Sequence, residues 1–405
     1  MLRRYNLIVT VSNPPGRAVD NFARARALSA KIGTETKNHE GLKLQEGVMT
    51  TINPGLRMVR LGADTVQIGL GPGGMVLAGL QGCEVAFLDA LRQGITDSLV
   101  FKRAEELGVE APRAHELCAA LASHLFSDAE LHAEGFRAER LLPEHASLLG
   151  LHQQPCKTLM NRREHAVVHL VGLGRTGSAL AGVLVGAGVG TMLLEDDRPV
   201  CPSDVGPGSF KLSDLGLARS VAVRRRLLRI DPGCNAHILH DGGQGGPDLR
   251  CLDLAIVTGH DVVAANTVAR FVAAERPHLF VVIREQDGML GPLVIPGETA
   301  CAECVDHHRG VATTAWQDGQ VSPVMPGRHP GLLENIALAT TLAGMAATHA
   351  LLFLDAVNQP GSYSAVMTFH PENGRWTRQE FTTHPGCGCQ WQNQPFATIS
   401  KTASP

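Results

Sequence analysis

Two close cysteine pairs in the C-terminal third of this 405-residue chain have the residue type and spacing of a metal site. Cys301 and Cys304 are separated by two residues, and Cys387 and Cys389 flank a single glycine on a second Pro- and Gly-containing segment. Thiolates are strong zinc ligands, and two tight pairs on separate turns complete a tetrahedral site. Because four thiolates leave no open coordination position, we predict a structural zinc ion that ties the C-terminal segment to the core.

Two other interpretations of these pairs are open. His307 and His308 are near enough in sequence to act as alternative ligands, although solvated surface histidines fit the same pattern. A Cys-x-x-Cys pair can also carry thiol redox chemistry. The other six cysteines are scattered, and we interpret them as ordinary buried thiols because disulfides are rare in cytosolic proteins. They are Cys83, Cys118, Cys156, Cys201, Cys234 and Cys251.

A glycine-rich turn in the middle of the chain has the pattern of a nucleotide-binding loop. Gly172, Gly174 and Gly177 follow an apolar strand and open a helix. Glycines at these places permit a tight turn and let backbone N–H groups face a phosphate at the helix N-terminus. Asp196 follows the next strand, where a carboxylate accepts hydrogen bonds from a ribose. The alternatives are a Rossmann-like layer that keeps the glycines for packing only, and a dehydrogenase that uses the loop for NAD.

The segments around this loop predict a parallel sheet covered by helices. Residues 165–174 are almost continuously apolar before the glycines, as expected for a central strand that is buried on both faces. Strands and helices then alternate at the spacing of β-α-β units. The helices are expected at 175–188, 214–229, 262–276 and 332–354, and the strands at 188–197, 252–258, 278–284, 363–369 and 375–381. We assign this α/β domain to residues 165–391 and a polar tail to 392–405.

A smaller α+β module is predicted at residues 51–130. Apolar and polar residues alternate through 54–70, which is typical of a β-hairpin, and the apolar run at 75–80 suggests a third strand. Three segments with helical spacing follow. They cover 81–93, 97–107 and 112–126. Three short strands with three short helices indicate a winged-helix-like fold.

The segments that flank this module have weaker patterns. Residues 1–50 are mixed polar, and we expect a poorly ordered extension with a short helix at 19–31. Met49 directly precedes the first well-patterned segment and is a second candidate start of translation. The acidic and His-containing segment 131–164 is predicted to be a linker.

The composition excludes several classes of protein. The formal net charge is −3 and charged residues make up 19%, so the chain lacks the basic excess that is typical of nucleic-acid binders. Hydrophobic residues make up 44%, but the longest apolar stretch, 178–194, is interrupted by glycines and ends in acidic residues. It therefore predicts a buried helix and strand rather than a membrane span. The N-terminus has no signal-peptide core, so we expect a cytoplasmic protein.

Several segments of the α/β domain together resemble the ThiF/MoeB/HesA adenylyltransferases of the E1-like superfamily. The resemblance covers about 165–391, and the segments that carry it are GAGVGTMLLEDDRPVCPSD, LARSVAVRRRLLRIDPGCNAHI and the CAEC pair. It implies a Rossmann-like fold with a zinc site, ATP with Mg²⁺ as cofactors, and a homodimer. It also implies activation of a C-terminal carboxylate as an acyl-adenylate.

The resemblance is uneven at the positions that carry adenylation. Asp196 falls on the family's ribose-binding acid, and Arg219 falls where the family has a lysine. The family's arginine should lie near 204–210, but this segment reads DVGPGSF. The metal-binding aspartate falls on His260 or, with a shift of one residue, on Asp261. The resemblance therefore leaves enzymatic activity open.

A narrower resemblance combines the HPGCGC ending, the altered adenylation positions and the N-terminal module. It is to the ThiF-like, leader-peptide-binding partners of YcaO-type cyclodehydratases in azoline (thiazole/oxazole) peptide biosynthesis. It implies that the N-terminal module is a RiPP recognition element, in which a leader pairs with a strand edge beside a helix. The edge would be 75–79, and the groove residues would be Val76, Leu117, Leu121 and Leu125. Each of these residues also fits the core of a winged-helix fold.

Three functions follow from these observations. The first is a non-catalytic protein that binds the leader of a ribosomal precursor and presents the precursor to the cyclodehydratase. The second is an active E1-like adenylyltransferase that uses ATP on a peptide carboxylate. The third, an NAD-dependent oxidoreductase, explains the glycine loop but not the cysteine pairs.

Overall fold

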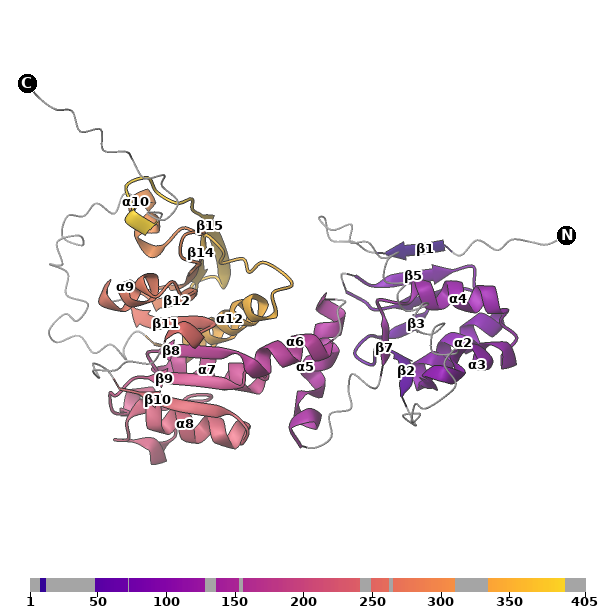
Figure 1. Ribbon diagram of the computed structural model, residues 1–405, viewed down its shortest axis with the longest axis horizontal. Helices are drawn as coiled ribbons and strands as arrows, with labels where there is room; N and C mark the ends of the chain where they lie inside the picture. Colours follow the sequence, from indigo (N-terminus) through magenta and orange to yellow (C-terminus); the bar gives the residue numbers. More distant parts are fainter. Residues whose placement is uncertain are drawn as a thin grey trace, which may run out of the picture. The chain divides into compact units, whose positions relative to one another are not determined.

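The computed structural model describes residues 8–11, 48–71, 73–127, 136–152, 156–240, 249–261, 265–309 and 334–389. The chain divides into two compact units, Met1–Met160 and Asn161–Pro405. In Figure 1 the first unit is coloured indigo to magenta, and the second continues to yellow.

The N-terminal unit contains a four-stranded antiparallel sheet in the order β1-β5-β4-β3. Its strands are β1 (Ile8–Val11), β3 (Met58–Arg60), β4 (Val66–Ile68) and β5 (Met75–Ala78). β3 and β4 form a hairpin and β5 pairs with β4, in the ranges that the alternating pattern predicts. β1 is a strand inside the segment that was expected to be poorly ordered, and it pairs with the outer edge of β5. The expected helix at 19–31 lies outside the described residues.

Helices pack against this sheet and form one apolar core. They are α2 (Gly82–Gln93), α3 (Val100–Glu106) and α4 (Ala111–Ala120), and a small second sheet has the order β6 (Ile95–Thr96), β2 (Met49–Ile52), β7 (Leu125–Ser127). The N-terminus of α2 is closed by the Glu84 carboxylate, which accepts the Gln81 N–H at 2.7 Å. Gly94 ends the same helix at φ +94°. Phe87 and Leu88 are fully buried in this core.

The segment expected to be a linker contains helical structure. α5 (Phe136–His152) and α6 (Cys156–His165) occupy most of 131–164. Leu141, Leu148 and Leu159 are buried, at 6%, 2% and 0% exposure. Leu141 and Leu148 are seven residues apart, which is a helical spacing, but Pro143, Glu144 and His145 lie between them and weaken the pattern.

The C-terminal unit is built on an eight-stranded sheet in the order β10-β9-β8-β11-β12-β13-β14-β15. Neighbouring strands from β10 to β12 are parallel, and β13 to β15 continue the sheet antiparallel. The strands are β8 (Val167–Val171), β9 (Thr191–Glu195), β10 (Asn235–Leu239), β11 (Leu254–His260), β12 (His278–Ile283), β13 (Gly288–Val294), β14 (Ala365–His370) and β15 (Arg375–Glu380). This is the mixed α/β architecture that the alternating pattern predicts.

Helices cover both faces of this sheet. They are α7 (Arg175–Gly186), α8 (Arg219–Ile230), α9 (Ala265–Ala273), α10 (Ala302–Arg309) and α12 (Ile336–Asp355). α7, α8 and α12 share one core with Leu170 and Ile256. α9 and α10 share the other with Val257. Adjacent residues such as Ile256 and Val257 enter opposite cores because side chains alternate along a strand.

One helix among the described residues, α12, is long and apolar enough to cross a membrane. Leu342 and Ala346 of α12 are buried at 0% exposure in the core that α7 and α8 share. Asn335 caps the helix by accepting the Leu338 N–H at 2.9 Å. Its apolar composition is thus accounted for by packing against the sheet.

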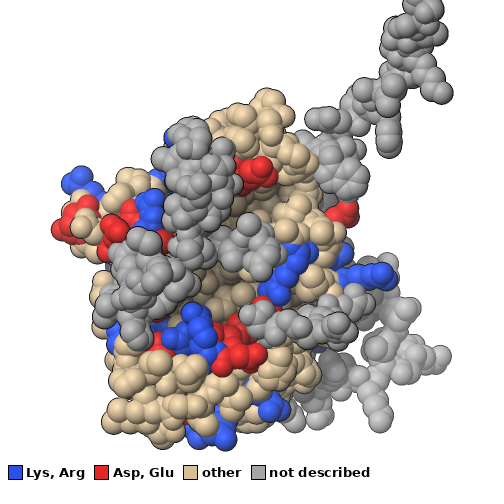
Figure 2. All heavy atoms as spheres, turned by 90° about the vertical axis from the view of Figure 1, so that its left-hand side faces the viewer, with Lys and Arg blue, Asp and Glu red and all other residues tan. Residues whose placement is uncertain are grey.

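Charged side chains of the C-terminal unit form ion pairs with one another. Arg163 and Asp355, at 4% and 1% side-chain exposure, form an ion pair of 2.7 Å. Arg270 binds Glu195 at 2.8 Å. On the face drawn in Figure 2, uncharged residues predominate, and basic and acidic side chains lie next to one another near its centre. This intermingling agrees with the small net charge of the sequence.

Two buried histidines should make the protein acid-sensitive. Burial lowers the pKa of His278 and of His349 to about 4 each. The unfolded chain binds these protons near pH 6.5, so it holds more protons than the folded chain between pH 6.5 and 4, and stability falls as the pH falls through this window. Each histidine should account for about 3 kcal/mol of that loss. In urea titrations at pH 7 and 4.5, His278→Gln should lose less stability than the wild type, whereas an equal loss would contradict the assignment.

Candidate functional site

The glycine loop after β8 is held by contacts within the chain. Gly172 has φ +83°, and a Cβ there would lie 2.6 Å from the Thr258 carbonyl oxygen. A Cβ on Gly177 would lie 2.0 Å from the Gly172 oxygen. The turn therefore requires glycine at both positions for its own backbone, with or without a nucleotide.

A carboxylate of the chain itself lies at the N-terminus of α7, where the loop would face a phosphate. Glu334 Oε2 accepts the Thr176 N–H at 3.0 Å. A Cβ on Gly174 would lie 2.6 Å from Glu334 Oε1, so the second glycine makes room for this side chain. Helix N-termini favour anions, and here the bound anion is Glu334.

Glu334 is buried and held as a carboxylate. It is 6% exposed, and its Oε1 lies 2.7 Å from His260 Nε2. Burial alone would raise the pKa of Glu334, but the contact with His260 and the hydrogen bond from the Thr176 N–H outweigh it, and the pKa is lowered. The Arg175 guanidinium also donates to the Glu334 carbonyl oxygen at 2.9 Å. Glu334 is the site residue that the sequence pattern missed, because no motif marks it.

Asp196, the expected ribose-binding acid, already has several donors. It is 7% exposed, and Oδ2 accepts the Leu173 N–H at 2.8 Å. Arg198 Nη2 reaches Oδ2 at 2.8 Å, and its Nε reaches Oδ1 at 2.8 Å. Burial would raise the pKa of Asp196, but the bond and charge of Arg198 outweigh it and lower the pKa. The carboxylate therefore holds the glycine loop and an arginine together.

Arg219, expected in place of the family's lysine, faces an acid of its own chain. Its Nη2 binds Asp204 Oδ1 at 2.7 Å, and its Nη1 lies 3.3 Å from Asp196 Oδ2. Both Arg219 and Asp204 are buried. A phosphate would have to compete with a carboxylate that is already paired in low dielectric. The structure thus brings Arg219 and Asp196 together, but as an ion pair.

Asp261, the residue predicted to bind the metal of a nucleotide, lies directly after β11. It follows β11 with φ +57°, and its N–H donates to the Ile283 carbonyl at 2.8 Å. The preceding residue, His260, is the one that contacts Glu334. The sequence left His260 and Asp261 open as the residue at the metal-binding position. Of these two, His260 contacts Glu334 beside the glycine loop.

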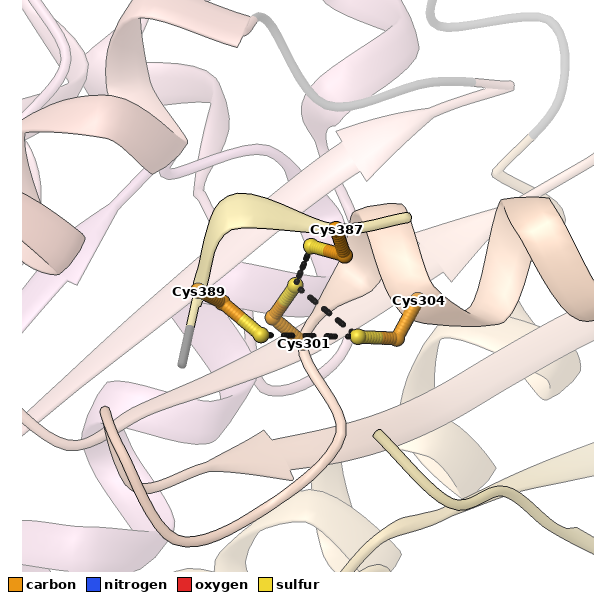
Figure 3. A group of neighbouring side chains, drawn as sticks. All are labelled: Cys301, Cys304, Cys387 and Cys389. Atoms are coloured by element: carbon orange, nitrogen blue, oxygen red, sulfur yellow. Dashed lines mark hydrogen bonds between the residues drawn. The ribbon is translucent and has the colours of Figure 1, made fainter. Parts of the chain in front are cut away.

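The four paired cysteines form one cluster (Figure 3). Cys301 and Cys304 lie at the start of α10, and Cys387 and Cys389 lie on the loop after β15. The Sγ–Sγ distances are 3.7 Å for Cys301–Cys304, 3.5 Å for Cys301–Cys387 and 3.5 Å for Cys304–Cys389. A tetrahedral zinc site with bonds of about 2.3 Å places its sulfurs about 3.8 Å apart. The cluster therefore has the size that a metal ion needs.

The surroundings of the cluster also suit thiolate ligands. Burial raises the pKa of Cys301 and of Cys389 to about 12 and raises that of Cys387 further. Burial would also raise the pKa of Cys304, but the His384 N–H, 3.3 Å from its sulfur, and neighbouring donors lower it. Burial disfavours isolated thiolates in this pocket. A metal ion bound to the four sulfurs would stabilise all of them as thiolates.

The histidines beside the cluster have other contacts. The His307 ring stacks on His384 with centroids 4.7 Å apart, and His308 Nε2 lies 2.9 Å from the Thr382 carbonyl. The described cysteines are free thiols. The four sulfurs, all within 4.8 Å of one another, form a complete set of ligands without a histidine.

The residues expected to bind a peptide do not share one surface. Leu117 and Leu121 are buried at 0% exposure in the core of the N-terminal unit, so their side chains have no surface to offer. Leu125 is partly buried and packs against that core. Val76 is half-buried on β5, between Gln67 of β4 and Thr10 of β1. The structure thus favours the alternative, a winged-helix core, for Leu117 and Leu121.

Comparison with solved structures shows similarity across both units. E. coli MccB with succinimide superposes with a TM-score of 0.64 at 15% identity, covering 85% of this chain and 99% of that chain. The microcin C7 biosynthetic enzyme MccB in complex with N-formylated MccA gives 0.63 at 14%, covering 84% and 99%. PaaA gives 0.53 at 15%, covering 66% and 91%. At such identities the likeness shows a shared fold alone.

Comparison with known sequences identifies the family. No curated protein matches the chain. The ThiF family model matches residues 148–389, which is more than half of the chain and includes the glycine loop and all four clustered cysteines. Because this match spans more than half of the chain, the chain belongs to the ThiF family.

Proposed function

We propose that this protein binds the leader of a ribosomally made precursor peptide through its N-terminal unit and presents the precursor to a YcaO-type cyclodehydratase for azoline formation, without adenylating a substrate itself. The observation that carries the proposal is the outer edge of β5, which accepts an extended segment along all four of its residues. Main-chain pairing at such an edge is a common way to bind peptides.

The edge of β5 is well placed to select a peptide. Met75 and Leu77 of β5 point into the core, so the strand is held rigidly. Val76 and Ala78 alternate with them and are half-buried. A peptide strand paired here would contact these two side chains on the opposite face of the sheet from the core.

The glycine loop argues against adenylation. Glu334 places a negative charge at the helix N-terminus where the triphosphate would bind, and like charges repel strongly in a buried site. Arg219, the expected phosphate cation, is bound to Asp204. These contacts support the proposal that the ThiF fold is kept as a scaffold.

The related structures are consistent with a peptide partner. One of them is the microcin C7 biosynthetic enzyme MccB in complex with N-formylated MccA, a protein of the same fold with a bound partner. Another is MccB with ATP. The proposal takes the first property for this chain and not the second, because the edge of β5 pairs with an extended segment and Glu334 accepts a backbone N–H at the N-terminus of α7. A structural zinc ion at the cysteine cluster, a homodimer and a cytoplasmic location complete the proposal.

Leader binding can be measured by fluorescence polarisation with the full chain. The probes are fluorescein-labelled leader halves of candidate precursor peptides, chosen from any short open reading frames found near this protein's gene. Val76→Lys places a charge on the half-buried strand surface, so we expect at least about tenfold weaker binding. Leu99→Lys, at a residue that is 47% exposed and outside the four-stranded sheet, is the matched control and should bind like the wild type. Equal affinity of all three proteins, or no binding at all, would contradict the proposal.

A further inference from the structure

The outer edge of β5 is already paired with a segment of the same chain. β1 lies antiparallel to β5, with Ile8 opposite Ala78 and Val11 opposite Met75 (Figure 1). The other edge of β5 pairs with β4 through Val66–Ile68. A strand has two edges, so β1 takes the one that the proposed function assigns to a leader peptide.

The sequence of β1 suits this position. Ile8-Val9-Thr10-Val11 consists of β-branched residues alone, which favour extended pairing. The chain then continues Ser12-Asn13-Pro14-Pro15, and a proline has no N–H to add to the pairing. The edge therefore pairs with a short β-branched segment, which indicates the chemistry that it accepts.

We propose that Ile8–Val11 is a resident occupant of the peptide-binding edge, and that an external leader of similar extended, β-branched character binds only by displacing it. This inference rests on the proposed function for the identity of the external ligand. The resident strand weakens the binding of every external peptide, since each must compete with β1 for the edge.

The size of this weakening follows from the linkage of β1 to its own unit. A segment of the same chain competes with an external peptide at an effective concentration that the length and stiffness of its connection set. The apparent dissociation constant of an external peptide rises in inverse proportion to the fraction of edges that are free. If nine edges in ten are occupied, the affinity for a peptide falls by about tenfold.

The test releases β1 in the full-length protein and uses the chain's own segment as the probe. Successive N–H groups of a strand point to opposite sides, so one of Val9 and Thr10 directs its N–H at β5. The double substitution Val9→Pro with Thr10→Pro removes that donor in either case. Val9→Ile with Thr10→Val keeps both N–H groups and the branching, and is the matched control. The probe is a labelled peptide of residues 6–13, NLIVTVSN.

We expect the proline variant to bind this probe at least about tenfold more tightly than the wild type and the control do in fluorescence polarisation. Equal binding by all three proteins would overturn the inference, because the edge would then be free in the wild type. Failure of the probe to bind the proline variant, with its circular dichroism unchanged, would also overturn it, because the edge would then not accept the segment.

The precursor leader separates this inference from the proposed function. If the leader binds the wild type and the proline variant equally, the proposed function stands and the resident strand is refuted. If the probe prefers the proline variant but no leader binds any of the proteins, the resident strand stands and the proposed function fails.

Discussion

Replacing Cys304 by serine is expected to abolish metal binding and to lower the melting temperature by roughly 10 °C. Cys304 is fully buried, and its sulfur lies 3.7 Å from that of Cys301 and 3.5 Å from that of Cys389. The cluster connects α10 with the loop after β15, two segments that are more than 80 residues apart in sequence. Loss of such a cross-link frees the C-terminal loop and exposes the apolar core around it.

The magnitude follows from the energetics of structural zinc. Such ions contribute on the order of 10 kcal/mol in zinc-finger peptides, where the metal carries most of the fold. This unit also has two apolar cores, so we expect only part of that value, about 3–4 kcal/mol. In a domain of this size each kcal/mol shifts the melting temperature by roughly 2–4 °C.

Elemental analysis and a thermal melt measure this prediction. Cys251→Ser is the matched control, because Cys251 is an exposed thiol outside the cluster. It should keep one zinc ion per chain and the wild-type melting temperature. Wild-type protein purified without metal, with Cys301 and Cys304 joined as a disulfide by mass spectrometry, would favour the redox interpretation instead.

Removing the Glu334 side chain is expected to open the glycine loop to nucleotide. The wild type should not bind MgATP at millimolar concentration, because a buried carboxylate accepts the Thr176 N–H where a phosphate would bind. Glu334→Ala removes both the charge and the bulk and leaves the loop N–H groups free for an anion. We expect its affinity for MgATP to rise by at least about tenfold in isothermal titration calorimetry.

Two further variants show which property of Glu334 matters. Glu334→Gln keeps the shape without the charge, and it should bind more weakly than Glu334→Ala because the amide still fills the position. Glu372→Ala, at an exposed position in the turn between β14 and β15, should behave like the wild type. ATP–pyrophosphate exchange by the wild type that is lost in Asp196→Ala would instead establish the adenylyltransferase alternative.

Local patterns predict most elements of both units. Alternation at β3 and β4, helical spacing in α2 and α4, and the apolar strand β8 before the glycines are features of short windows of sequence. Hydrophobic periodicity reports which face of an element is buried, so it locates elements without reporting their partners. The cysteine cluster is also predicted from the sequence. The two cysteines of each pair are close in sequence, and a tetrahedral zinc site needs four ligands, so each pair predicts that the other lies beside it.

The contacts at the two candidate sites join residues that are far apart in sequence. Glu334 lies 158 residues from Thr176 in sequence, and nothing around it resembles a phosphate-binding motif. By sequence, β1 belongs to a mixed polar extension, and only its pairing with β5 identifies it as a strand. Leu117 and Leu121 fit a groove or a core equally well by spacing, and only packing shows them buried.

The sequence alone thus determined most of the α/β elements, the glycine turn and the paired thiols of this protein, because backbone propensity and side-chain chemistry act over a few residues. The tertiary structure decided which groups occupy the sites that those elements build. It placed a carboxylate of the chain at the α7 N-terminus and a strand of the chain along β5. Which group occupies each site depends on contacts between segments that are far apart in sequence. The physical reason is that a helix N-terminus needs an anion and a strand edge needs a hydrogen-bonding strand, and the fold determines which segment supplies them.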